Sequence, residues 1–208
     1  IRKMTPNIFR RLSGSPDATR LFKKKTAVLL LEYQNEHFTG LLPIEAAYAA
    51  VAPAVALMNW ADKHKIMVCH VRHLAKSRAS TVFAPDSAGA EFYPELAPRK
   101  THTVYTKYAS SAFAGSLLHT DLEAAGVDTL IVAGLDSPTT VSATAHDAKL
   151  LGYKTIVAAT LCAARDTVSW DKNRITKGDQ MNDIALSAIA DKYAQVELST
   201  AITALELA

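Results

Sequence analysis

Cysteine is scarce in this chain, and its scarcity excludes the small secreted proteins that depend on disulfide bonds. Only Cys69 and Cys162 occur among the 208 residues, in or just after apolar runs typical of strands. Disulfide-dependent domains carry several cysteines at short spacings. We therefore expect no disulfide framework and a protein that works in a reducing compartment.

Long apolar runs and glycine-rich phosphate loops are also missing. No run approaches the roughly 20 apolar residues of a membrane-spanning helix, so no transmembrane segment is predicted. The turn GLDSP, residues 134–138, lacks the repeated glycines of a nucleotide-binding loop. With 49% hydrophobic and 21% charged residues, the composition is that of an ordinary globular domain.

Acidic residues are nearly absent from residues 1–25, which hold eight Lys or Arg and only Asp17. Apolar residues recur there at near-helical spacing: Ile1, Met4, Ile8 and Leu12. An amphipathic, arginine-rich, acid-poor start is typical of organellar transit peptides. It predicts a protein of the mitochondrial matrix side; the alternative is a cytoplasmic protein with a solvated basic tail. Because the segment lacks aromatic interleaving beyond Phe9 and Phe22, no nucleic-acid surface is predicted.

Strand-like apolar runs alternate with helical patterns after this basic segment. The predicted strands are Thr26–Tyr33, Ile66–Arg72, Thr103–Lys107, Asp128–Ala133, Lys154–Ala159 and Gln195–Leu198. The predicted helices are Pro53–Lys65, with Pro53 in its first turn, Ala114–Ala125, Thr139–Leu151, Met181–Tyr193 and Thr200–Leu207. The stretches Leu74–Arg99 and Thr167–Gln180 read as long loops.

This alternation predicts an α/β fold, a three-layer Rossmann-like parallel sheet flanked by helices. We divide the chain into a basic extension, residues 1–25, and one domain, residues 26–208. The carboxyl ends of parallel strands meet at one edge of a sheet, where α/β sites usually form. Three features fall on that edge: Glu32 after the first strand, Lys107 after the third and Ser137–Thr140 after the fourth.

Four motifs occur in order along the chain: LLLEYQNEHF, HVRH, KYASSAF and AGLDSPTTVSATAHDAKLLGY. In combination they resemble the isochorismatase-like cysteine hydrolases, a superfamily that includes nicotinamidases and isochorismatase itself. The resemblance covers roughly Lys25 to Leu205. It implies an Asp, Lys and Cys triad, in which a thiolate attacks an amide carbonyl and backbone N–H groups stabilise the oxyanion.

Only one triad position keeps the residue that the resemblance implies. Lys107 matches the lysine, Glu32 stands at the aspartate position and Thr140 at the cysteine position. A threonine hydroxyl is far less acidic than a thiol, and its β-branched side chain is restricted. Leu161 stands where an acidic residue is implied, and Glu36 matches the second acidic residue of the first motif.

Each of these residues also has a structural interpretation. Glu32 and Lys107 could form a buried pair that an ancestral site has left behind. Ser137 and Pro138 could be the cap and first turn of an ordinary helix. His70 and His73 are three residues apart and so do not share a strand face, so no zinc site is predicted; no cofactor is predicted either.

We interpret the chain as a catalytically degenerate relative of these hydrolases. Its predicted role is that of a structural subunit, bound to protein subunits of a larger, mitochondrial assembly through its basic segment and loops; a homo-oligomer is a further expectation. The alternative is an active hydrolase of a small amide or vinyl ether, with Glu32 as acid or base and Lys107 as electrostatic support. A third is a binding protein that keeps the pocket without turnover.

Overall fold

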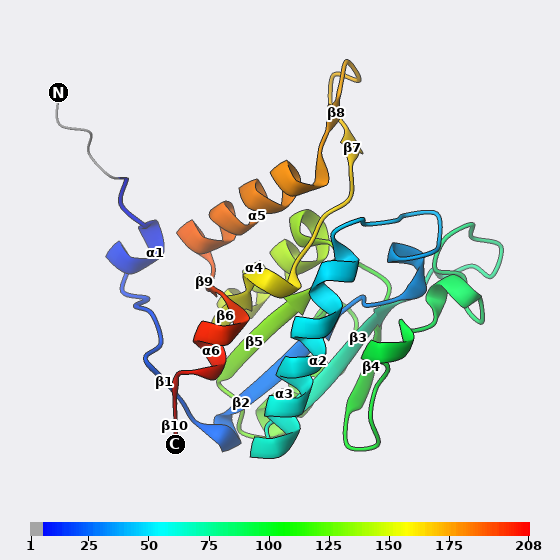
Figure 1. The fold of residues 1–208 in the computed structure, drawn as a ribbon. Helices are drawn as coiled ribbons and strands as arrows, with labels where there is room; N and C mark the ends of the chain where they lie inside the picture. Colours follow the sequence, from blue (N-terminus) through cyan, green and yellow to red (C-terminus); the bar gives the residue numbers. More distant parts are fainter. Residues whose placement is uncertain (1–5) are drawn as a thin grey trace, which may run out of the picture.

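One parallel β-sheet forms the centre of the molecule, a computed structural model that describes residues 6–208 (Figure 1). Its strands are β2 Thr26–Leu31, β3 Met67–His73, β4 Thr103–Lys107, β5 Thr129–Gly134, β6 Lys154–Ala158 and β9 Gln195–Glu197. They lie in the order β4-β3-β2-β5-β6-β9, and all neighbours are parallel. The predicted α/β parallel sheet flanked by helices is confirmed.

Helices cover both faces of this sheet. They are α2 Ala47–His64, α3 Leu118–Ala124, α4 Ser142–Leu150, α5 Gly178–Lys192 and α6 Ser199–Thr203. One buried apolar cluster joins α2 and α6 to Val28 and Leu30 of β2. The other joins α3, α4 and α5 to Ala27, Leu29 and Leu31. The alternation follows from the two-residue period of a strand, and it explains why β2 is apolar on both faces.

All five predicted helices differ in their bounds from the structure, most of all at the start of α2. Helix α2 begins at Ala47, so Pro53 lies inside the helix and not in its first turn. The alanine-rich stretch before Pro53 favours helix, and Ala47 and Ala50 bury their side chains there, which offsets the hydrogen bond that proline cannot donate. The predicted helix Thr200–Leu207 is shorter than expected, because α6 ends at Thr203 and a short strand follows.

The predicted loop Thr167–Gln180 is also partly wrong. It contains a β-hairpin of β7 Thr167–Val168 and β8 Ile175–Thr176, and α5 already begins at Gly178. The two strands are only two residues long, too short for a reliable alternation of apolar and polar side chains. In Figure 1 this hairpin projects from the body beyond the start of α5.

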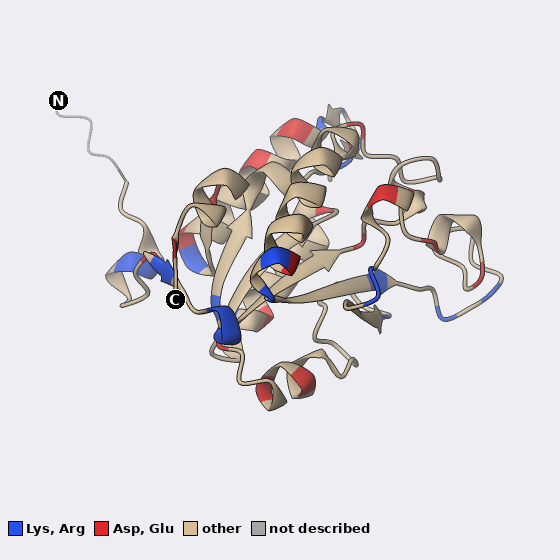
Figure 2. Cartoon of the chain, turned by 60° about the horizontal axis from the view of Figure 1, so that its bottom comes forward, with Lys and Arg blue, Asp and Glu red and all other residues tan. Residues whose placement is uncertain are grey.

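The described part of the basic segment, residues 6–25, packs along the body as an arm; residues 1–5 lie outside the described residues. Helix α1 Phe9–Leu12 lies against α5, and β1 Arg20–Leu21 pairs with the terminal strand β10 Glu206–Leu207. Figure 2 shows the arm's Lys and Arg residues gathered at the same end of the molecule as the C-terminus.

Buried Arg10 anchors this arm. Its guanidinium donates to Ala190 O at 2.9 Å, near the carboxyl end of α5, and to Asp17 Oδ1 at 2.5 Å. A cation suits that end of a helix, where carbonyl groups lack intrahelical partners. Between residues 6 and 208, no helix combines the length and apolarity that crossing a bilayer requires.

Candidate active site

Glu32 follows β2 in a backbone conformation that is uncommon for a residue other than glycine. Its φ is +53°, in the left-handed region. The chain is held there by the Glu32 N–H, which donates to Val71 O of the neighbouring strand at 2.8 Å. Such strain persists only where surrounding contacts fix it, and it is concentrated at functional sites. The turn directs the carboxylate into the crevice between β2 and β5, where the strand order reverses.

The structure brings the three predicted site residues together. Thr140 Oγ1 donates a 2.6 Å hydrogen bond to Glu32 Oε1, and Lys107 Nζ forms an ion pair with the same oxygen. Lys107 Nζ also donates to Ala109 O at 2.7 Å. All three side chains are buried. The ends of β2 and β4 and the turn after β5 thus meet at one point, as the sequence predicts.

Two histidines that sequence reasoning missed complete this network. His37 Nε2 lies 3.3 Å from Glu32 Oε2, and its Nδ1 lies 3.2 Å from Leu42 O. His73 Nδ1 lies 3.3 Å from Lys107 Nζ. Because an ammonium group can only donate hydrogen bonds, the ring nitrogen of His73 is the acceptor. Burial lowers the pKa of His73. The negative charge of Glu32 opposes this shift, and the positive charge of Lys107 adds to it.

Glu32 is ionised despite its burial. Burial alone would raise its pKa, but the hydrogen bond from His37 and the positive charge of Lys107 outweigh that effect. The pKa of Glu32 consequently falls to about 2. The carboxylate is therefore a weak base and, at neutral pH, almost never an acid.

Thr140 lies in a single π-helical turn, Ser137–Val141, that leads into α4. The predicted cap at Ser137 is wrong: Asp136 occupies the N-cap position, while Ser137 Oγ donates to Asn182 Oδ1 of α5 at 2.6 Å. Contact with α5 decides this, since a hydroxyl can bond to any nearby acceptor. The predicted Pro138 in the first turn is confirmed. Asp136 O accepts from the N–H groups of Thr140 and Val141 at 3.1 and 3.3 Å.

Two other positions that the resemblance singles out, Glu36 and Leu161, have structural contacts. Glu36 Oε1 accepts from Leu41 N at 2.6 Å and Oε2 from Phe83 N at 3.3 Å, so its carboxylate joins two loops beside the site. Gly89 permits this approach, because a Cβ there would lie 2.3 Å from Glu36 Oε2. Leu161 is buried, and its carbonyl accepts a 2.5 Å hydrogen bond from Tyr33 Oη.

Neither cysteine contacts the triad positions. Cys69 lies within β3 and Cys162 after β6, and burial raises the pKa of each thiol to about 12. Both therefore stay protonated and unreactive at neutral pH. Across residues 6–208, no group of three or more His, Cys, Asp or Glu side chains could hold a metal ion.

His70 belongs to a second buried cluster, between β3 and α2. Its Nε2 lies 2.9 Å from His102 Nδ1, and His102 Nε2 lies 3.0 Å from Asp62 Oδ1. The N–H of Arg99 also donates to His102 Nδ1 at 3.2 Å, so that nitrogen accepts and His70 Nε2 donates. His70 Nδ1 is then a buried acceptor without a partner among the described residues.

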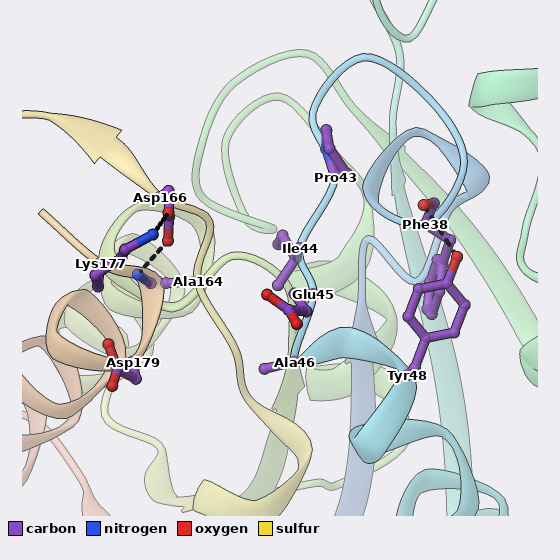
Figure 3. Close-up of a pocket in the computed structure, with 11 residues that line it drawn as sticks. Phe38, Pro43, Ile44, Glu45, Ala46, Tyr48, Ala164, Asp166, Lys177 and Asp179 are labelled. Atoms are coloured by element: carbon purple, nitrogen blue, oxygen red, sulfur yellow. Dashed lines mark hydrogen bonds and ion pairs between the residues drawn. The ribbon is translucent and has the colours of Figure 1, made fainter. Parts of the chain in front are cut away.

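A groove of about 810 Å³ opens beside the site (Figure 3). It lies between the segment that leads into α2 and the segment from β6 to α5, and none of Glu32, Lys107 and Thr140 lines it. Phe38, Ile44 and Tyr48 form its apolar side. Glu32, Lys107 and Thr140 are themselves buried, whereas other residues line the groove.

One protein-family model matches most of the chain. The model of the isochorismatase domain matches residues 26–189 of the chain. This protein belongs to the isochorismatase family. The predicted family is thereby confirmed, with Glu32, Lys107 and Thr140 all inside the matched region.

Relatives of this isochorismatase-family protein cover most of its length. An uncharacterized isochorismatase family protein of Bacillus subtilis, YddQ, is 26% identical over 85% of this chain and 97% of its own. The maleamate amidohydrolase of Pseudomonas putida is 28% identical over 78% of this chain and 84% of its own. Among solved structures, an isochorismatase from Pseudomonas putida is 28% identical with a TM-score of 0.87, covering 95% of this chain and 99% of that one.

Proposed function

We propose that this isochorismatase-family protein has lost cysteine-hydrolase chemistry and acts as a structural or interaction subunit of a larger assembly. The observation that carries the proposal is that the nucleophile position holds Thr140 in place of the implied cysteine. The only hydroxyl at the nucleophile position donates its proton to a carboxylate that already has Lys107 as its counter-ion. All the polar groups at this point have partners without a substrate.

The low pKa of Glu32 argues against both chemical roles considered for it. As a general base it would have to take a proton from a threonine hydroxyl, and each unit of pKa mismatch adds about 1.4 kcal/mol to the transfer. As a general acid toward a vinyl ether it would have to be protonated, and at a pKa of about 2 only about one carboxyl in 10⁵ is protonated at pH 7.

Retained hydrolysis is the second candidate, and one observation favours it. The three triad positions keep hydrogen-bonding distance, with 2.6 Å between Thr140 Oγ1 and Glu32 Oε1. Nucleophile and base within such reach are the structural sign of an activated nucleophile. The substrate class would be a small amide, since one relative is named maleamate amidohydrolase.

A gain-of-function experiment separates these candidates. Thr140→Cys with Glu32→Asp restores the residues that the family resemblance implies, and amide hydrolysis is measured on a panel that includes maleamate. We expect activity in the double variant and none in the unmodified protein. Turnover by the unmodified protein that Glu32→Gln abolishes would overturn the proposal, because it would show that the protein is a hydrolase that depends on Glu32.

The mitochondrial location remains part of the proposal and rests on the composition of residues 1–25. The arm's packing bears on it, because Arg10 and Arg20 form ion pairs with Asp17 and Glu206 in the folded protein. A targeting role would therefore act before the arm folds. Fractionation of the source cells, followed by the native mass of the protein in a gentle extract, tests both location and assembly. A free cytoplasmic monomer would contradict both.

A further inference from the structure

The β7–β8 hairpin exposes three large apolar side chains to solvent. Trp170, in its turn, is 95% exposed, and the opposed pair Val168 and Ile175 are 55% and 54% exposed. Isolated two-stranded hairpins are marginally stable in water. Exposed apolar side chains that include a tryptophan are typical of a contact surface.

Hydrogen bonds order the backbone of the turn that carries Trp170. Ser169 N donates to Arg174 O at 2.9 Å, and Lys172 N donates to Ser169 O at 2.8 Å. Asp171 accepts from Ser169 Oγ at 2.5 Å and from Asn173 N at 3.2 Å, which closes the turn. These bonds order the backbone of the turn before binding, which lowers the conformational entropy that the backbone loses in a contact.

The groove of Figure 3 has the complementary character. Its apolar side holds Phe38, which stacks on Tyr93 at 3.9 Å between ring centroids, and Tyr48, whose hydroxyl donates to Phe38 O at 3.1 Å. With a volume of about 810 Å³, it has room for an indole side chain, and an aromatic residue buries on the order of 200 Å² in such a contact.

The groove and the hairpin also carry opposite charge. Glu45 and Asp179 line the groove without an ion-pair partner among residues 6–208, and the charge of Lys177 is paired with Asp166 at 2.7 Å. On the hairpin, Lys172 and Arg174 likewise have no carboxylate within ion-pair distance in the described chain, and they outnumber its one carboxylate, Asp171. The groove is therefore acidic and the hairpin basic, so contact between them pairs charges.

We propose that two copies of this chain form a dimer in which the hairpin of each copy inserts Trp170 into the groove of the other. The groove wall includes Asp166 and Lys177, which directly flank the hairpin. Two hairpins lying antiparallel about a two-fold axis would each place its tip at the base of the other, which is the self-complementary contact of an isologous dimer. This inference does not depend on whether Thr140 turns over a substrate.

The native mass of the full chain, measured by sedimentation velocity across the micromolar range, is the first test. We expect a concentration-dependent dimer of twice the 22.4 kDa chain mass. Trp170→Ala is expected to weaken association at least about 30-fold, the effect of losing a buried tryptophan anchor. Leu117→Ala is the matched control, because Leu117 is exposed but lies outside hairpin and groove, and it should leave association unchanged.

Charge reversal identifies the contact itself. Glu45→Arg and Arg174→Glu should each weaken the dimer, and combining them in one chain should restore much of the loss. Cross-linking adds a second readout that keeps Trp170: Ala46→Cys chains mixed with Lys172→Cys chains should form a disulfide between chains, since Cys69 and Cys162 are buried. A monomer at all concentrations, or a dimer that Trp170→Ala and both reversals leave intact, would overturn the proposal.

Discussion

At the carboxyl edge of the sheet Glu32 is buried as a charged group, whereas beneath α2 His70 is buried as a neutral one. Glu32 has partners on both oxygens: Thr140 and Lys107 on Oε1, and His37 on Oε2. Burial and the neighbouring His102 instead lower the pKa of His70 to about 3, and its Nδ1 has no partner among the described residues. A buried group keeps its charge only where opposite charge and hydrogen bonds replace water.

Removing the counter-ion of Glu32 should have the largest effect. Lys107→Met leaves the carboxylate buried without its cation and should lower the free energy of unfolding by about 3–5 kcal/mol. Denaturant unfolding followed by circular dichroism measures the loss. Glu32→Gln combined with Lys107→Met should cost less than the two single changes added together, because both belong to one pair. Additive losses would contradict the ion pair.

Neutral, buried His70 should make the fold sensitive to mild acid. With a folded pKa of about 3 against an ordinary 6.5, His70 contributes stability that is complete above pH 6.5 and is lost as the pH falls toward 3. The expected slope is about 1.4 kcal/mol per pH unit below pH 6.5. Glu32 acts in a lower window, between its ordinary 4.5 and about 2.

The variant His70→Leu tests this predicted slope of stability with pH between pH 6.5 and 5. His102 Nδ1 keeps the hydrogen bond from Arg99 N in this variant, so no new unpaired group is created. The unfolding free energy, measured by denaturant titration at each pH, should lose most of its acid slope. Because the pKa of His73 is also lowered, a smaller slope should remain. An unchanged slope would show that His70 is not the sensitive group.

Thr140→Val should have the smallest effect of the three changes. It removes one hydrogen bond to Glu32 Oε1, which Lys107 still neutralises, and should cost about 1 kcal/mol. The matched control is Thr155→Val, because the Thr155 hydroxyl is buried without a partner among the described residues. Thermal unfolding should show the control to be neutral or stabilised. Equal losses in both variants would mean that the Thr140 bond contributes little.

The order of elements and the meeting of Glu32, Lys107 and Thr140 could be predicted from the sequence. Apolar runs define the strands, and parallel strands deliver their carboxyl ends to one edge. His37 could have been found, since it follows Glu32 by five residues in the same motif. The partners of His70 could not: His102 and Asp62 lie 32 and 8 residues away, and only the packing of α2 on β3 brings them together.

The hairpin and the arm show the same limit on the surface of the molecule. The strands of the hairpin are too short to give a periodic signal, although Thr, Val and Ile flank its polar turn. For the arm, the composition of residues 1–25 indicates a basic segment but contains no information about what it contacts. Arg10 donates its hydrogen bond to the carboxyl end of α5 only in the folded chain.

The sequence by itself determined the α/β fold, the carboxyl edge as the location of the site, and threonine in place of the implied cysteine. These follow from local periodicity and from residue identity, which do not depend on distant contacts. Tertiary structure alone decided that Glu32 is a paired carboxylate, that His70 lies against His102, and that Trp170 stands exposed at a turn. The reason is physical: charge, burial and exposure depend on what the folded chain places around each group.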